Sequence, residues 1–162
     1  MESHYEFKIL KSVMKVNERQ KTILLGPILD HYNGSLTNIT IALWGLAFKP
    51  DTDDIREAPA LKVAQRLLEK GVEVRAADPI VTQAQIDAAA GKGRVSLVES
   101  EMKAAEGADV LVLVTEWRQY RSPDFDELRT LMRGSTLIDG RNQWSRRQVT
   151  AAGFTYLGIG RS

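Results

Sequence analysis

The sequence predicts an α/β fold: a doubly wound, Rossmann-like parallel sheet of about six strands, preceded by a long N-terminal helix. From residue 39 onward, short apolar runs rich in β-branched residues alternate with amphipathic stretches. This alternation is typical of parallel strands joined by right-handed helical crossovers. The 162-residue length suits one domain with a short extension. We place a helical segment at residues 1–34 and the sheet domain at residues 35–162.

The extension has the apolar spacing of a single helix over residues 5–32, with lysines, glutamate and arginine on the other face. Gly26-Pro27 lies inside the pattern and should kink or break the helix. Asn33-Gly34 ends it. The apolar stripe is unusually wide, so it either packs wholly on its own domain or in part faces another domain or subunit. Residues of this stripe that could face a partner are Leu10, Val13 and Met14.

The elements of the sheet domain follow from local signals. Pro59 can begin a helix because its missing N–H is not needed in the first turn, and Gly71 ends that helix. The run VLVLVT at residues 110–115 is typical of a buried central strand. The predicted strands are residues 39–44, 72–76, 95–98, 110–115, 136–139 and 154–159, and the predicted helices are 59–70, 82–90, 99–106, 124–133 and 146–152.

Composition excludes several classes of function. Lys and Arg number 22 against 21 Asp and Glu. This balance argues against a nucleic-acid-binding protein and against binding to an anionic membrane. The sequence shows no targeting segment and no apolar run that could span a bilayer. It contains no cysteine, which excludes a disulfide framework, a thiolate metal site and a cysteine nucleophile within these residues, and fits a cytoplasmic protein.

In a doubly wound sheet, ligands bind beyond the carboxyl ends of the strands. The loop after the first strand lacks the G-x-G-x-x-G spacing, is not a P-loop, and does not fit an EF-hand. Between residues 49 and 57 two cations face four carboxylates, a net charge of −2. Phosphate binding here would therefore need Lys49 and Arg56 as directed side chains. The alternative is a salt-bridged loop that only caps the following helix.

Arg141 is the second candidate, since it follows the fifth strand directly after Asp139-Gly140. In the usual strand order it lies two strands from Lys49, about 10 Å away, so both could bind one sugar diphosphate. The alternative is a surface arginine paired with Asp139 or a helix end. Asp78 ends the second strand and is a weak candidate for ribose binding. No residues have the spacing of a metal site or a catalytic triad.

Several segments together resemble the UDP-glucose/GDP-mannose dehydrogenase family, and more specifically the carboxyl-terminal UDP-binding domain of its UDP-glucose branch. The longest is GLAFKPDTDDIREAPAL at residues 45–61. Thr52 and the pair Glu116-Trp117 favour the UDP-glucose branch over the GDP-mannose branch. The other matching segments are VNERQK at 16–21, ADP at 77–79, VTEW at 114–117, DGRN at 139–142, GF at 153–154 and GIGR at 158–161.

The resemblance implies roles for individual residues. Phe48, Lys49 and Arg141 match residues that contact the UDP-sugar, UDP-glucose or UDP-glucuronate. Arg56 matches an arginine that reaches NAD, which in this family is held mainly by another domain. The carboxylates of the loop would orient the two cations. The resemblance implies no metal ion, and no residue of this chain is assigned as catalytic.

The family oxidises the primary alcohol of UDP-glucose twice, to UDP-glucuronate, with two NAD and a cysteine nucleophile that forms a thiohemiacetal and then a thioester. A chain without cysteine cannot perform this chemistry alone. We therefore expect a fragment, a split-gene product or an excised domain, inactive in isolation. Family members are homodimers built on the central helices.

Two alternatives remain. One is a stand-alone nucleotide-sugar binding or regulatory module, and the other is a different small Rossmann-like enzyme that uses NAD or S-adenosylmethionine. The missing glycine fingerprint disfavours the latter.

Overall fold

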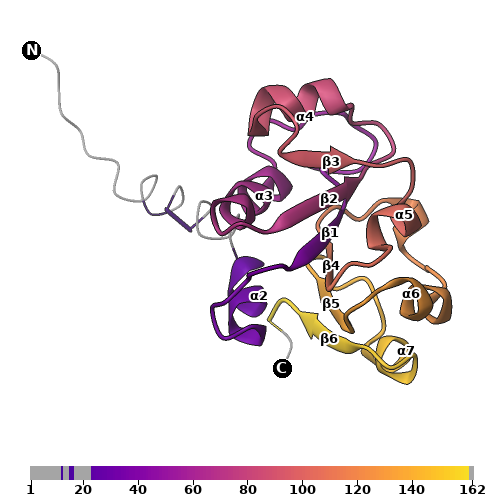
Figure 1. Ribbon diagram of the computed structural model, residues 1–162. Helices are drawn as coiled ribbons and strands as arrows, with labels where there is room; N and C mark the ends of the chain where they lie inside the picture. The colour runs from indigo at the N-terminus through magenta and orange to yellow at the C-terminus, as the bar shows by residue number, and fades with distance from the viewer. Residues whose placement is uncertain (1–11, 13–14, 17–22, 161–162) are drawn as a thin grey trace, which may run out of the picture.

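The core of the protein is one six-stranded, entirely parallel sheet. The computed structural model describes Ser12, Lys15, Val16 and residues 23–160. The strands lie in the order β3-β2-β1-β4-β5-β6, so the chain reverses direction across the sheet between β1 and β4 (Figure 1). The strands are β1 Thr40–Trp44, β2 Glu73–Ala77, β3 Val95–Leu97, β4 Val110–Leu113, β5 Thr136–Asp139 and β6 Thr155–Gly158.

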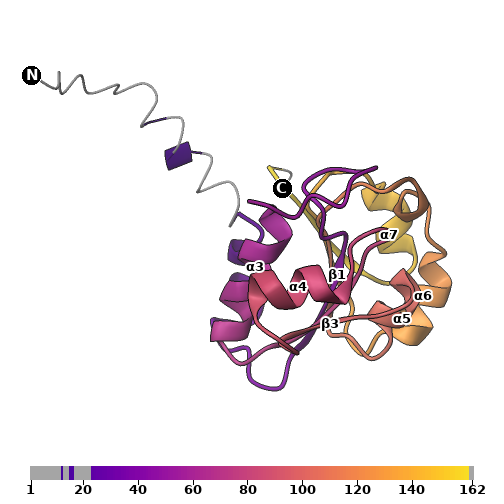
Figure 2. The same ribbon diagram turned by 90° about the horizontal axis from the view of Figure 1, so that it is seen from above.

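Helices cover both faces of the sheet. Figures 1 and 2 show α2, α3 and α4 on one face and α5, α6 and α7 on the other. All residues of β1, β4 and β5 are buried, because the central strands of a parallel sheet are covered on both sides. The helices are α2 Leu25–His31, α3 Pro59–Glu69, α4 Gln83–Ala90, α5 Glu101–Ala105, α6 Phe125–Leu131 and α7 Arg146–Ala151, with a 3₁₀ turn η1 at Arg118–Tyr120.

The predicted α/β sheet with its six strands is confirmed, and each strand and helix of the sheet domain lies within a few residues of its predicted range. Local signals explain this agreement. Pro59 begins α3, and Thr82 and Gln85 form a capping box that begins α4. Sequence reasoning did not predict η1, which is only three residues long.

The prediction of one long helix over residues 5–32 is wrong in the part that the structure describes. Ile23 and Leu24 form a turn, and α2 begins afresh at Leu25. The predicted break at Gly26-Pro27 is therefore misplaced: the turn ends at Leu24, and Gly26-Pro27 lies in the first turn of α2, where the missing N–H of Pro27 costs no hydrogen bond. Before that turn only Ser12, Lys15 and Val16 are described, all helical. The predicted partner-facing residues Leu10, Val13 and Met14 lie outside the described residues.

Candidate functional site

Four loops meet at the carboxyl ends of the strands, where the sequence places the ligand site. They follow β1, β2, β4 and β5, which are neighbours in the sheet order. Because the strands are parallel, their carboxyl ends share one edge. The loops comprise residues 45–58, 78–82, 114–117 and 140–145.

Gly45, which follows β1, and Thr115, just after β4, contact each other at this edge. Gly45 has a φ of +89°, and a Cβ on it would lie 2.4 Å from the Thr115 Cβ. A larger residue is thus excluded both by backbone conformation and by space. The Thr115 hydroxyl donates a 2.6 Å hydrogen bond to the Ala47 carbonyl. The loop after β1 consequently leaves the sheet in a fixed direction.

Asp78 anchors the same loop from the end of β2. Its Oδ2 accepts hydrogen bonds from the amides of Leu46 (2.8 Å) and Ala47 (3.1 Å). The Trp117 indole N–H, from the segment after β4, donates to the same oxygen at 3.1 Å. Oδ1 accepts two further hydrogen bonds, from the amides of Ile80 and Val81, at 3.0 Å each. Five donors saturate this carboxylate, so it ties three strand ends together and has no free acceptor for a ribose hydroxyl.

Phe48 and Lys49 follow directly and point away from the core. The Phe48 side chain is 50% exposed, and Lys49 is exposed as well. The Phe48 amide donates a 2.8 Å hydrogen bond to the Asp54 carbonyl, which closes residues 48–54 into a compact turn. Across the described residues the Lys49 ammonium has no hydrogen-bond or ion-pair partner, so it is available to an anion.

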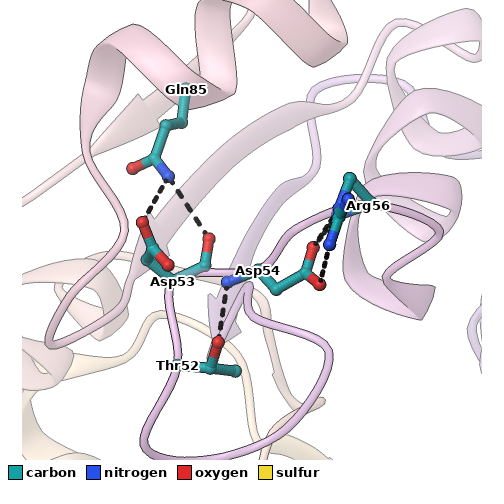
Figure 3. A network of polar contacts seen from close by, with 5 residues as sticks. All are labelled: Thr52, Asp53, Asp54, Arg56 and Gln85. Carbon is teal, nitrogen blue, oxygen red and sulfur yellow. Dashed lines mark hydrogen bonds and ion pairs between the residues drawn. The ribbon is translucent and has the colours of Figure 1, made fainter.

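Arg56 forms a bidentate pair with Asp54 (Figure 3). Its Nε donates to Oδ1 and its Nη2 to Oδ2, both at 2.9 Å, and its backbone amide also donates to Oδ1 at 3.0 Å. These hydrogen bonds lower the pKa of Asp54 to about 2 and raise the pKa of Arg56. The Arg56 side chain is 88% exposed. Its Nη1 edge therefore remains open to a ligand while the Nε edge fixes its direction.

Arg141 is directed by two groups at the end of β4. Its Nε donates a 2.7 Å hydrogen bond to the Val114 carbonyl. The same nitrogen lies 2.8 Å from Glu116 Oε2, an ion pair without a hydrogen bond of its own. No hydrogen bond within the described residues uses its two terminal nitrogens. The predicted alternative of a salt bridge with Asp139 is not observed: the hydrogen bond that Arg141 donates to Asp139 comes from its backbone amide, at 3.0 Å, and not from its guanidinium.

Asp139 is the buried support of this loop. Besides the Arg141 amide, it accepts hydrogen bonds from the Trp144 amide (2.7 Å) and the Tyr156 hydroxyl (3.1 Å). Like Asp78, it uses its charge to hold backbone rather than a cation. Lys49 and Arg141 thus follow strands two positions apart, about 10 Å by strand spacing, and neither is paired with Asp78 or Asp139.

Sequence reasoning missed two residues of this edge, Thr115 and Gln85. Gln85 on α4 donates to the Asp53 carboxylate at 3.2 Å and to the Asp53 carbonyl at 3.3 Å (Figure 3). The spacing Thr82-x-x-Gln85 indicates a capping box, but nothing local connects it to a residue 32 positions earlier. Gln85 and residues 52–56 line an open hollow of about 430 Å³.

Comparison with known proteins identifies the family to which this arrangement of loops belongs. The sequence model described as UDP-glucose/GDP-mannose dehydrogenase family, UDP binding domain, matches residues 42–146. The chain belongs to the UDP-glucose/GDP-mannose dehydrogenase family. The matched range contains every site residue predicted from the sequence, which are Phe48, Lys49, Arg56 and Arg141.

Relatives within the family include UDP-glucose 6-dehydrogenase of Pseudomonas aeruginosa, which is 46% identical over 160 residues. The match covers 97% of this chain and 35% of that protein. TuaD, a UDP-glucose 6-dehydrogenase of Bacillus subtilis, is 35% identical over 157 residues, covering 97% of this chain and 33% of that one. The chain thus spans about a third of the length of these curated relatives, and matches the UDP-binding domain.

Solved structures agree with the family. UDP-D-ManNAc dehydrogenase from Pyrococcus horikoshii superposes with a TM-score of 0.77 at 31% identity, over 99% of this chain and 35% of that one. A UDP-glucose dehydrogenase from Pyrobaculum islandicum gives 0.74 at 30% identity, over 94% and 32%. The Rossmann-like fold of this domain is therefore shared with nucleotide-sugar dehydrogenases.

The described residues offer neither a metal site nor a membrane span. Among those residues, no three His, Asp or Glu side chains gather in a way that could hold a metal ion. None of the helices described is both long and apolar enough to cross a membrane.

Proposed function

We propose that this chain is the UDP-sugar-binding part of an NAD-dependent UDP-glucose 6-dehydrogenase, which oxidises UDP-glucose to UDP-glucuronate. One observation carries the proposal. Lys49 has no hydrogen-bond or ion-pair partner among the described residues, and Arg141, held at its Nε by Val114 and Glu116, keeps two terminal nitrogens without a hydrogen bond among them. Both residues lie at the carboxyl edge of the sheet. The matched family and the names of its relatives supply the ligand class.

In this proposal Phe48, Lys49 and Arg141 contact the substrate. The two cations bind the diphosphate or sugar oxygens, because charge-assisted hydrogen bonds are the strong ones at such a site. The exposed Phe48 ring offers an apolar surface beside them. Glu116 and the Val114 carbonyl hold the Arg141 guanidinium by its Nε, which leaves its two terminal nitrogens without a hydrogen bond among the described residues.

NAD is the proposed cofactor, and it accepts the hydride in each oxidation. The residues present fit a contact with it rather than a whole binding site. Arg56 has an exposed guanidinium edge that suits a phosphate, whereas the sequence has no G-x-G-x-x-G fingerprint after a strand. We therefore assign Arg56 to a contact with NAD held mainly by another domain.

The covalent chemistry lies elsewhere. Two successive oxidations through a covalent intermediate need a cysteine nucleophile, and this sequence has none. We expect this chain alone to bind UDP-glucose and to oxidise none. We also propose that the complete enzyme is a cytoplasmic homodimer. Sedimentation of a stable monomer, for a protein of full relative length, would contradict the dimer.

Calorimetric titration of the purified chain with UDP-glucose tests the proposal. Lys49→Ala and Arg141→Ala should each weaken binding at least about 10-fold, because each removes a charge-assisted hydrogen bond. Arg147→Ala is the matched control, since it removes an exposed arginine from α7. GDP-mannose should bind more weakly than UDP-glucose. Absence of binding, or NADH formation by the chain alone, would refute the assignment.

A further inference from the structure

Gln85 uses both ends of its side-chain amide. Its Oε1 accepts hydrogen bonds from the Thr82 amide at 2.9 Å and from the Thr82 hydroxyl at 2.8 Å, which caps α4. Its Nε2 donates to the carboxylate and the carbonyl of Asp53 (Figure 3). One residue therefore couples the start of a helix to the loop that carries the proposed binding residues.

Asp53 precedes Asp54, whose hydrogen bonds hold the loop in its conformation. The Asp54 carbonyl accepts the Phe48 amide at 2.8 Å, and the Asp54 amide donates to the Thr52 hydroxyl at 3.1 Å. The Asp54 carboxylate holds Arg56. Fixing Asp53 thus fixes the direction in which the loop presents both the Phe48-Lys49 pair and Arg56.

The loop has few other ties. Asp78 and Thr115 hold its beginning, at Leu46 and Ala47. Beyond that point, within the described residues, the hydrogen bonds that join residues 48–56 to a part of the chain distant in sequence all come from Gln85. Ile55 packs on the core. Gln85 is therefore the polar attachment of the far end of the loop.

We propose that Gln85 is a positioning residue for ligand binding, acting as a latch that sets the loop of residues 48–56 in its binding conformation. This inference rests on the proposed function. The amide suits the task chemically. A carboxylate at this position would repel the loop, whose net charge over residues 49–57 is −2, and a lysine could not accept the hydrogen bonds from Thr82.

The substitution Gln85→Glu separates the latch from the helix cap. Glutamate is as good as glutamine in a capping box, so α4 should keep its start. The new carboxylate faces the Asp53 carboxylate and cannot donate to it. In the 162-residue chain, the dissociation constant for UDP-glucose should rise about 3- to 10-fold. Amide hydrogen exchange at Phe48 should accelerate, while the melting temperature should stay within about 2 °C.

A second substitution should rescue the first. Asp53→Asn, combined with Gln85→Glu, again pairs an amide donor with a carboxylate, with the donor now on the loop. Binding and amide exchange should return to within about 2-fold of the unmodified chain. Gln148→Glu is the charge control, because it adds the same carboxylate on α7. That helix packs on β6, the outermost strand on the other side of the sheet from β3 and α4.

Three outcomes would overturn the latch: unchanged binding and unchanged exchange in Gln85→Glu, an equal loss in Gln148→Glu, or no recovery in the double variant. Failure of the proposed function gives a different result. If the unmodified chain does not bind UDP-glucose, the exchange of the Phe48 amide still reports whether Gln85 holds the loop, because that measurement needs no ligand.

Discussion

The two edges of the sheet use the aspartates at their strand ends in opposite ways. At the amino edge, Asp109 accepts hydrogen bonds from the Thr40 amide and from Nε and Nη2 of Arg133, whose Nη2 also donates to the Asn38 carbonyl. At the carboxyl edge, most of the donors to Asp78 and Asp139 are backbone amides. A carboxylate satisfied mainly by backbone amides needs no cation, whereas one satisfied by an arginine occupies the donors of that arginine. The first arrangement suits a binding site and the second a structural joint.

The largest expected effect concerns packing at the amino edge. A Cβ on Gly134 would lie 1.9 Å from the Asp109 carbonyl oxygen, so Gly134→Ala must push two backbone segments apart. We expect a loss of at least about 3 kcal/mol in the free energy of unfolding, measured by urea denaturation. Gly26→Ala is the control, because nothing lies within 4 Å of its Cβ, and it should be neutral or slightly stabilising. Equal stability of the two variants would show that the amino edge is not tightly joined.

Two arginines, one at each edge, should separate stability from binding. Arg133→Ala leaves the Asp109 carboxylate without its cation and should lower the free energy of unfolding, with little change in UDP-glucose binding. Arg141→Ala should do the reverse. Urea denaturation of both variants measures the loss of stability, and calorimetric titration measures the loss of UDP-glucose binding. If Arg133→Ala weakened binding as much as Arg141→Ala, the distinction between the edges would fail.

The smallest effect is the response to acid. Burial alone would raise the pKa of Asp109, but the hydrogen bonds from Arg133 and Thr40 and the Arg133 charge outweigh it and hold the pKa below its usual value. A lowered pKa in the folded state contributes stability above the unfolded value, about 3.9, and that contribution is lost as the pH falls through the folded value. Asp109→Asn removes this pH-dependent contribution to the free energy of unfolding.

Thermal melting at pH 6 and pH 3 measures the contribution of the Asp109 carboxylate to stability. The unmodified chain should melt higher than Asp109→Asn at pH 6, and the gap should narrow by about 2–4 °C at pH 3. The Asp54–Arg56 pair lowers the pKa of Asp54 to about 2 and so responds to acid in the same direction, but its contribution should be small because both groups are exposed to solvent. A gap that widened toward pH 3 would contradict the direction assigned to Asp109.

The proposed site was only partly accessible from the sequence. The positions of Lys49, Arg56 and Arg141 after predicted strands, with the motif at residues 45–61, placed them at one edge of the sheet. The sequence did not show what each carboxylate binds. Asp78, considered as a ribose acceptor, is saturated by five protein donors.

The sequence by itself determined the alternation of strands and helices, because apolar periodicity, Pro59 and the glycine stops are local signals. It also predicted the edge of the sheet for the proposed ligand site, since parallel strands end at one edge. Only the tertiary structure decided the contacts between Gln85 and Asp53, between Thr115 and Ala47, and the turn at Ile23 that precedes α2. The first two join residues 32 and 68 positions apart. Such pairs form because the fold brings strand ends and helix starts together, and no pattern within a few residues encodes that proximity.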